Sequence, residues 1–285
     1  MGALVLYALL LAAGLLPLIA GMLLAGASGY PVSAAVLVLG VAAMVCLMVA
    51  ALAAREAFAY QVGRWPSWER QPAGGWDRVA HILLGAAGLL GVMLQFGLNT
   101  GDLTIPLGGV GALAGYFCFA PPLQWYKRGW FEAAGALCFG LLPVLAGYYL
   151  QTGHLISEVF VYGTPLSLAA FNVFLVHGIP EAARKSQPAR FSLAERLSPP
   201  ATGLLFTVVN VLTIACLVFY LFFPAGALPA RWALWVLLIL AVINQELVKR
   251  RAYYDEGRIT LLCRLTLALH LAMGLIFTWG LWQRV

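Results

Sequence analysis

The residues best suited to chemistry lie in two polar stretches that interrupt otherwise apolar sequence. The first begins with Arg55 and Glu56, and the second covers residues 177–198, HGIPEAARKSQPARFSLAERLS. Only 10% of all residues are charged, so the second stretch is unusually rich in charge. Charge of this density cannot lie in hydrocarbon, and we expect a hydrated loop or cavity wall at one membrane face. Arginine and lysine there would bind phosphate groups, and carboxylates would hold a divalent cation.

The rest of the chain predicts an all-α, polytopic membrane protein. Hydrophobic residues make up 62% of its 285 residues, and apolar runs of about 20 residues are typical of transmembrane helices. Nine such segments fall near 3–26, 32–54, 79–99, 103–121, 131–151, 156–177, 200–223, 231–248 and 259–282. The N-terminal segment has no charged start and is expected to be a retained first span. The five cysteines lie singly in these segments, without the spacing of a metal site.

Most of the basic residues fall in four connections, which predicts the topology. These connections are residues 55–78, 122–130, 178–199 and 249–258, and alternating spans place all four at one membrane face. The positive-inside rule assigns that face to the cytoplasm, with the N-terminus inside and the C-terminus outside. The net charge of +6 is therefore interpreted as a topology signal, and nucleic-acid binding is not expected.

The spacing of the polar stretches also predicts an internal duplication within one domain, residues 1–285. Loops 55–78 and 178–199 each follow the second span of a four-helix unit, one covering 1–121 and the other 131–248, with 259–282 as a ninth helix. A parallel repeat would bring both loops over one central cavity.

A family resemblance appears in residues 116–153, YFCFAPPLQWYKRGWFEAAGALCFGLLPVLAGYYLQTG. This stretch resembles the central signature of the UbiA superfamily of intramembrane prenyltransferases, most closely the branch that prenylates dihydroxynaphthoate for menaquinone. The matching residues are Lys127, Glu132, Gly140, Pro143, Gly147, Tyr149 and Gly153. Pro17 and Gly21 resemble the family's opening span, and SLAERLS at 192–198 is similar to the stretch after its second motif. The resemblance implies a UbiA-like bundle of about nine helices around a central cavity.

The family's acidic motifs are mostly replaced in this chain. In REAFAYQVGRW at 55–65, Glu56 takes the position of the first aspartate and Arg55 that of the asparagine. In EAARKSQPARFS at 181–192, Glu181 and Lys185 take the two aspartate positions, and Arg190 takes that of the lysine. The resemblance therefore implies Glu56 and Glu181 as the catalytic carboxylates and the ligands of magnesium.

These replacements change the expected chemistry of the cavity mouth. Two glutamates could hold at most one magnesium ion, since such ions bridge carboxylates and substrate phosphates. A basic mouth can bind diphosphate directly, because arginine offers paired donors and lysine a point charge. The predicted diphosphate-binding residues are Arg55, Lys127, Arg184, Lys185 and Arg190. The predicted cavity wall consists of Tyr116, Tyr126, Tyr149 and His177.

Simpler interpretations stay open for the same residues. Glu56 and Glu181 are also compatible with interfacial charges paired with neighbouring basic residues. His177 is compatible with a hydrogen-bonded group at a helix end, and the aromatic residues with an interfacial belt. Glu246 and Arg250 have the spacing of an ion pair within one helix.

Two functions follow from the resemblance and from the altered motifs. One is a prenyltransferase that moves a polyprenyl group from its diphosphate to an aromatic acceptor in quinone or related lipid biosynthesis, in the inner membrane of a bacterium. The other is an inactive relative that binds an isoprenoid or quinone, or serves as a subunit of a membrane complex.

Overall fold

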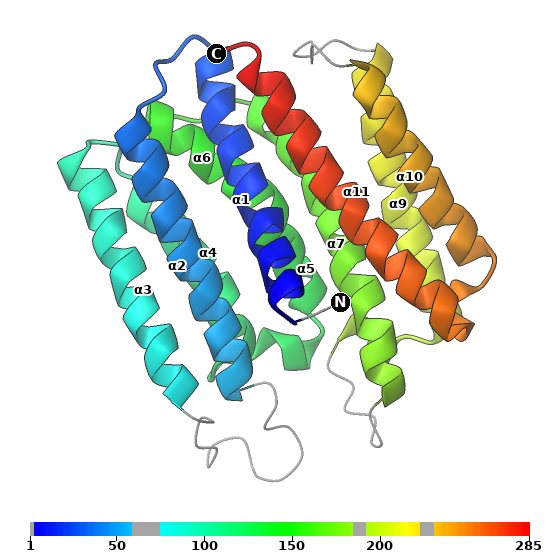
Figure 1. The fold of residues 1–285 in the computed structure, drawn as a ribbon. Coiled ribbons are helices and arrows are strands. Elements are labelled where there is room, and N and C mark those ends of the chain that lie inside the picture. The colour runs from blue at the N-terminus through cyan, green and yellow to red at the C-terminus, as the bar shows by residue number, and fades with distance from the viewer. Residues whose placement is uncertain (1–2, 59–74, 185–191, 223–230) are drawn as a thin grey trace.

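The computed structural model describes residues 3–58, 75–184, 192–222 and 231–285, with the backbone alone for 3–7, 180–184 and 231. Within them every regular element is helical, as the sequence predicts (Figure 1). The first half contains α1 (Ala3–Ala27), α2 (Ala34–Phe58), α3 (Trp76–Val92), the π turn η2 (Met93–Gly97), α4 (Thr104–Phe119) and the 3-10 turn η3 (Trp125–Arg128). The second half contains α5 (Phe131–Ala136), the π turn η4 (Leu137–Leu141), α6 (Leu142–Thr152), α7 (Glu158–Arg184), α8 (Leu193–Arg196), α9 (Pro199–Phe222), α10 (Arg231–Lys249), the 3-10 turn η5 (Ala252–Tyr254) and α11 (Glu256–Trp282).

Each of the nine predicted apolar segments corresponds to one helical rod. Eight rods in the described part of the chain are long and apolar enough to cross a membrane, and α4 is a shorter apolar helix of 16 residues. The rod formed by α5, η4 and α6 runs without a break from Phe131 to Thr152. The chain is therefore an integral membrane protein of the predicted all-α class.

The π turn η4 follows from the residues around it. Pro143 has no N–H and cannot continue the regular hydrogen-bond pattern of the preceding turn. The N–H of Leu141 donates to Oγ of Ser167 in α7, at 2.7 Å. The turn is thus stabilised by a neighbouring helix.

Helix α1 lies between two groups of helices (Figure 1). On one side α2 packs against α3 and α4, and on the other α7 packs against α9 and α11. Helix α1 joins the two groups, because it packs against α2, α6 and α11. The closest approach of α1 to α6 requires glycine, since a Cβ at Gly21 would overlap the backbone of Val144, and one at Gly147 that of Leu18.

The outer surface is that of a protein surrounded by lipid. Large apolar side chains on the outside of α3 are highly exposed, among them Ile82 at 70% and Leu89 at 69%. Exposed tryptophans lie on α10 and α11, where the rings of Trp232 and Trp279 are 6.3 Å apart. Tryptophan in such a position is typical of the interface between hydrocarbon and water.

A layer of buried polar residues divides the core of the second helix group. One apolar cluster contains Leu166, Leu237 and Leu269, and a second contains Leu175, Val248 and Leu262. On each helix a buried polar residue lies between the residues of the two clusters, namely Asn172 in α7, Asn210 in α9, Asn244 in α10 and Thr266 in α11. Asn210 donates to the carbonyl oxygen of Ala241 at 2.9 Å and to Oε1 of Gln245 at 3.1 Å, which joins α9 to α10.

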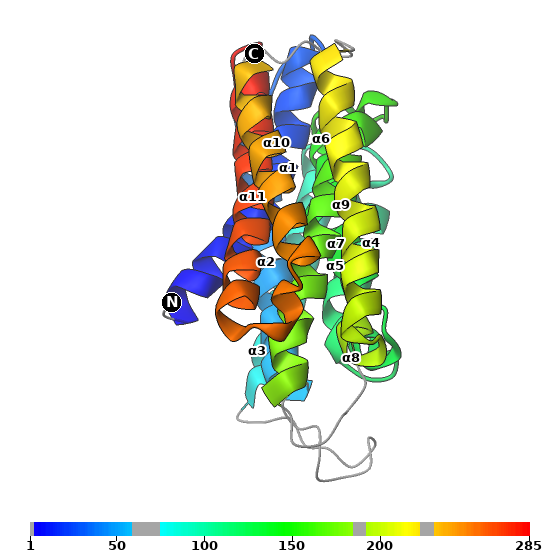
Figure 2. The same ribbon diagram turned by 90° about the vertical axis from the view of Figure 1, so that its right-hand side faces the viewer.

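The ends of the helices agree with the predicted alternation of spans. The end at which α2 finishes and α3 begins, at the bottom of Figure 1, is called the lower end below. The connections 121–130 and 250–255 lie there too, whereas the C-terminus lies at the opposite, upper end (Figures 1 and 2). Which end faces the cytoplasm, and whether the two four-helix units are repeats, stay predictions.

Candidate functional site

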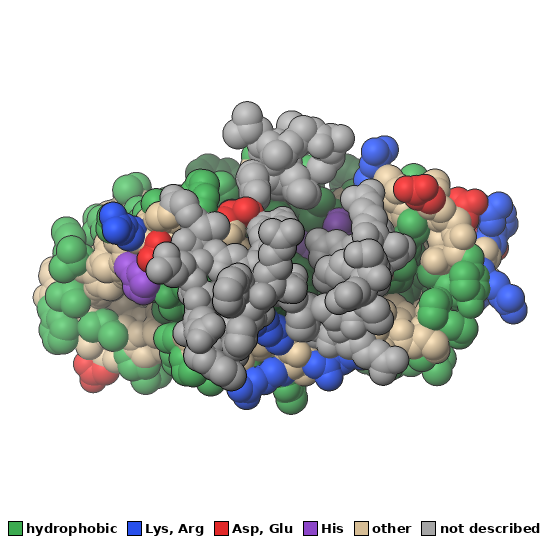
Figure 3. Space-filling view, turned by 90° about the horizontal axis from the view of Figure 1, so that it is seen from below, with side chains coloured by type: hydrophobic (Ala, Val, Ile, Leu, Met, Phe, Trp, Pro, Cys, Tyr) green, Lys and Arg blue, Asp and Glu red, His purple; other side chains and the backbone are tan. Residues whose placement is uncertain are grey.

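The candidate site is the lower end of the bundle, where the predicted chemistry should lie. Arg55 and Glu56 are half-buried in the last turn of α2, which ends at Phe58. The ends of α4 and α7 and the start of α5 lie at the same end (Figures 1 and 2). Seen from below, several Lys and Arg side chains lie together along one edge of this end (Figure 3).

Lys127 is held in the short connection between α4 and α5. Its Nζ donates to Oε1 of Gln124 at 2.8 Å and lies 5.7 Å from the centre of the Tyr126 ring. That ring packs in turn against Phe119, at 5.6 Å between centres. An ammonium group over a tyrosine face is weakly attracted to it, so Lys127 and Tyr126 form one unit of the site.

Two contacts join this connection to the segment that follows α7. Oε1 of Glu132 accepts the N–H of Leu193 at 2.8 Å, and the Glu132 side chain is completely buried. Nη2 of Arg196 donates to the backbone carbonyl oxygen of Lys127 at 2.7 Å. The first turn of α5 and the short helix α8 are therefore fixed to each other.

His177 has a local hydrogen bond near the end of α7. Its Nδ1 lies 2.7 Å from the carbonyl oxygen of Val173, four residues earlier. Because a carbonyl oxygen can only accept, Nδ1 must carry the hydrogen in this contact. This contact agrees with a hydrogen-bonded group at a helix end.

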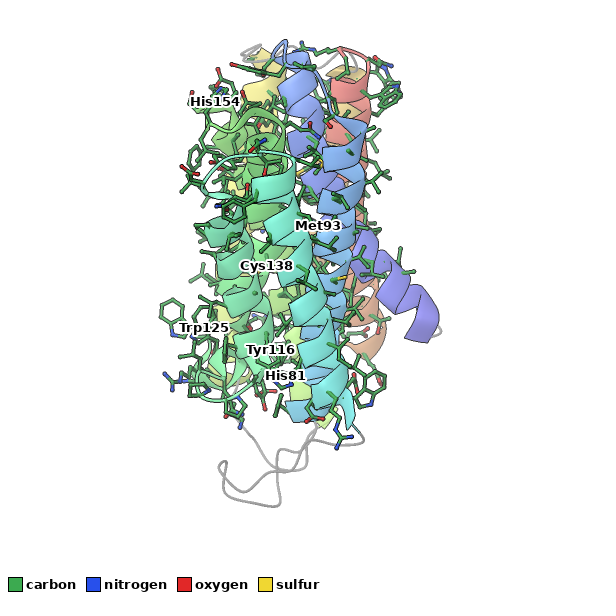
Figure 4. All side chains as sticks on the ribbon, turned by 90° about the vertical axis from the view of Figure 1, so that its left-hand side faces the viewer. His81, Met93, Tyr116, Trp125, Cys138 and His154 are labelled. Carbon is green, nitrogen blue, oxygen red and sulfur yellow. The ribbon has the colours of Figure 1, made fainter. Side chains whose placement is uncertain are left out.

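Tyr116 lies at the lower end but belongs to a packed cluster between α2, α3 and α4. It is buried beside Ala53, Ala54 and Ala80. Its hydroxyl lies 3.0 Å from Nε2 of His81, an exposed residue of α3 (Figure 4). The Tyr116 hydroxyl therefore connects α4 to α3.

Tyr149 lies at the upper end, away from the other predicted wall residues. Its hydroxyl accepts the N–H of Leu103 at 3.0 Å, beside Gly101, whose φ of 110° favours glycine. The labelled His154 marks this end in Figure 4, opposite His81 and Trp125. Tyr126 and His177 are thus brought to the end that holds Lys127, and Tyr149 is not.

Part of the predicted site lies outside the described residues. Glu181 and Arg184 belong to the last turns of α7, but their side chains are not described. Lys185 and Arg190 lie wholly outside the described ranges. The convergence of Glu56 with Glu181 and Arg190 stays a prediction.

The described residues contain no cluster of metal-binding side chains, and the side chain of Glu181, a predicted magnesium ligand, is not among them. Nowhere in the described ranges do three His, Cys, Asp or Glu side chains gather as they would around a metal ion. Glu56 follows Arg55 directly, and Glu132 is engaged by the N–H of Leu193. Magnesium is usually held by one or two carboxylates with substrate phosphates and water. A magnesium ion held by Glu56 and Glu181 stays a prediction.

The residue pairs that sequence reasoning missed are His81 with Tyr116, Glu132 with Leu193, and Arg196 with Lys127. The members of the last two pairs are 61 and 69 residues apart. The match of Glu132 to the UbiA-like stretch indicated that this residue has a role. The local sequence did not indicate that it would accept a hydrogen bond from Leu193.

The nine apolar helical rods in the described part of the chain define a polytopic integral membrane protein. No family model and no curated protein matches the chain. Among solved structures, it is similar to the apo structure of a UbiA homolog from Aeropyrum pernix K1, with a TM-score of 0.61 and 16% identity. The similarity covers 92% of this chain and 96% of that one. The chain therefore has the UbiA fold over almost its whole length.

Proposed function

We propose that the chain is a UbiA-like prenyltransferase, which transfers a polyprenyl group from its diphosphate to an aromatic acceptor. The observation that carries this proposal is the likeness to the UbiA homolog over 92% of the chain. A fold can host more than one function, so the proposal also rests on the residues at the lower end. The acceptor class is taken from the resemblance of residues 116–153 to the dihydroxynaphthoate branch. A place in quinone biosynthesis, in the inner membrane of a bacterium with the lower end in the cytoplasm, follows from that class and from the basic connections.

The chemistry proposed for the lower end is diphosphate binding through basic residues. Lys127 supplies a point charge, and Arg55, Arg184, Lys185 and Arg190 supply the other predicted donors. One guanidinium group can donate two N–H bonds to the oxygens of a phosphate. Such a site therefore neutralises the leaving diphosphate without a cluster of carboxylates to hold metal ions. Glu56 and Glu181 are proposed as the catalytic carboxylates, with at most one magnesium ion between them.

A second function is favoured by the replaced acidic motifs. Because Glu56 and Glu181 are the only carboxylates at the motif positions, and Lys185 takes the position of an aspartate, the chain is also a candidate for an inactive UbiA-like protein that binds an isoprenoid or quinone, or that serves in a membrane complex. Both functions predict binding of an isoprenoid compound, and only the first predicts a product. Product formation therefore separates them.

The test uses the full chain in lipid nanodiscs. Titration calorimetry with geranylgeranyl diphosphate, with and without magnesium, measures binding, and incubation with dihydroxynaphthoate measures transfer. We expect binding in both conditions, a product, and weaker binding by Lys127→Ala. Arg250→Ala is the matched control, because Arg250 is exposed and paired with Glu246 at 2.8 Å, near the lower end of α10.

Each outcome decides between specific statements. Binding that disappears without magnesium, with a product lost in Glu56→Gln, would replace the basic site by a metal-dependent one. Tight binding with no product from any aromatic acceptor would favour the inactive relative. No binding at all would overturn both functions.

A further inference from the structure

The contacts of α8 with the first turn of α5 and with the connection before α5 form a defined unit, which we call the clasp. The clasp consists of Glu132, Leu193, Arg196 and the backbone carbonyl of Lys127. It joins two segments that are more than sixty residues apart in the chain. One of the two segments contains Lys127, which is predicted to bind diphosphate.

Glu132 is the buried half of the clasp. Its side chain is completely buried, so the hydrogen bond from Leu193 is shielded from water. A buried acceptor that loses its donor is costly, which makes this contact worth more than one at the surface. Ser192 fixes the same turn from the other side, because its Oγ accepts the N–H of Glu195 at 3.2 Å.

The backbone of α7 is shaped to receive α8. A Cβ at Gly178 would lie 3.0 Å from Cβ of Ala194 and 3.1 Å from Oγ of Ser192. Glycine at this position therefore allows α8 to approach α7 closely. The clasp thus has support from α7 in addition to its two hydrogen bonds.

Arg196 is the exposed half of the clasp. Its guanidinium donates to the carbonyl oxygen of Lys127, and its side chain crosses over Gly129. Gly129 has a φ of 80°, and a Cβ there would lie 3.0 Å from Nε of Arg196. The backbone of Lys127 is therefore held in place by Arg196, the last residue of α8.

We propose that Glu132 and Arg196 are positioning residues, which act through the clasp to hold the backbone of Lys127 in place, so that its side chain is positioned for binding a diphosphate. The proposal rests on the proposed function, because it assigns a ligand to Lys127. The physical reason is preorganisation, since basic side chains held in place before binding lose less conformational freedom when an anion arrives. Neither Glu132 nor Arg196 is assigned a contact with the substrate.

The first measurement tests the clasp without any ligand. Hydrogen exchange of residues 192–197 is compared in the native chain, Glu132→Leu, Glu132→Gln and Arg250→Ala. We expect faster exchange at Leu193 and its neighbours in Glu132→Leu only, because glutamine keeps an oxygen that accepts the Leu193 N–H. Unchanged exchange in Glu132→Leu would overturn the clasp, whatever the function of the protein.

The second measurement tests what the clasp does. Calorimetry with inorganic pyrophosphate is applied to Glu132→Leu, Arg196→Ala and Gly129→Ala. We expect affinity to fall about tenfold in each, the factor that the loss of one good hydrogen bond produces. Glu132→Gln should restore native affinity, and Arg250→Ala should change it by less than about twofold, as for an exposed pair. If the Glu132→Leu variant does not fold, the Arg196→Ala and Gly129→Ala variants test the proposal.

The two measurements separate failure of the positioning role from failure of the proposed function. Native protein that binds no pyrophosphate, with exchange as expected, would overturn the proposed function and the positioning role but keep the clasp as a contact. Equal affinity in native protein and Arg196→Ala, with faster exchange in Glu132→Leu, would show that the clasp is structural only.

Discussion

The hydroxyl of Tyr116 lies 3.0 Å from Nε2 of His81, and this contact ties the end of α4 to the first turns of α3. Tyr116 is 8% exposed, whereas His81 lies on the outside of the bundle. The Tyr116 ring also packs edge-on against the rings of Phe58 and Phe117, with distances of 6.5 and 5.0 Å between ring centres. A residue expected to wall the cavity is thus part of the contact between neighbouring helices.

We predict that Tyr116→Phe lowers stability by about 1 kcal/mol, the usual worth of one hydrogen bond, because His81 loses its partner. Thermal unfolding in detergent measures the change. Tyr254→Phe is the control, since Tyr254 is 63% exposed and should tolerate the change. A Tyr116→Phe variant with native stability and strongly reduced substrate binding would instead support the cavity-wall role.

We predict that alanine at Gly21 or at Gly147 destabilises the protein by several kcal/mol, in the range of severe overpacking. In both cases the added Cβ would overlap backbone atoms of the opposite helix, which cannot move as a side chain can. The melting temperature in detergent is the measurement. Gly85→Ala in α3 should be neutral or slightly stabilising, because nothing lies within 4 Å of its Cβ position and alanine favours helix. Equal effects at Gly21 and Gly85 would show that the α1–α6 crossing is looser than described.

We predict different effects on stability for leucine at two asparagines of the buried polar layer. Asn210→Leu should destabilise by about 1–3 kcal/mol, because it leaves the carbonyl of Ala241 and the Gln245 side chain without their donor. Asn244→Leu should be neutral or stabilising, because neither polar atom of Asn244 has a hydrogen-bond partner among the described residues. Chemical unfolding of both variants in the same detergent compares them. Equal destabilisation would indicate that Asn244 binds a buried water.

We predict that the lower end faces the cytoplasm. A reporter that is active only in the cytoplasm should work when inserted after Arg128 and fail when fused to Val285 at the C-terminus. The reason is the concentration of Lys and Arg in the lower connections, which are retained inside. A reporter that is inactive after Arg128 and active at Val285 would contradict the assignment of the N-terminus to the cytoplasm.

The nine helices could be predicted from the sequence because a membrane span leaves a strong local signal. Hydrophobic runs of sufficient length set each element, so the expected segment 200–223 corresponds to α9, Pro199–Phe222. Ion pairs within one helix are also local, and the predicted pair of Glu246 and Arg250 is confirmed at 2.8 Å. The π turn at Leu137–Leu141 was not predicted, because it depends on Ser167 in another helix.

The site was less predictable, since it depends on contacts between distant parts of the chain. Glu132 was matched by its position in the family-like stretch, but its bond to Leu193 requires the packing of α8 on α7. Tyr149 was matched in the same way, yet its hydroxyl serves the turn at Leu103 at the upper end. A match to the family's signature thus predicts where a residue lies in the fold, whereas its chemical role depends on the residues that contact it.

The buried polar layer has a consequence for how the chain enters the membrane. Asn244 and Gln245 lie in the least hydropathic of the eight long spans, Trp232–Lys249, whose mean hydropathy is 1.6. Inserted alone, this span would expose two amides to lipid, which disfavours its release from the insertion machinery. The preceding span, α9, offers the Asn210 amide and the Thr207 hydroxyl to Gln245. Helices α9 and α10 are therefore suited to leave the translocon together, as a preassembled hairpin.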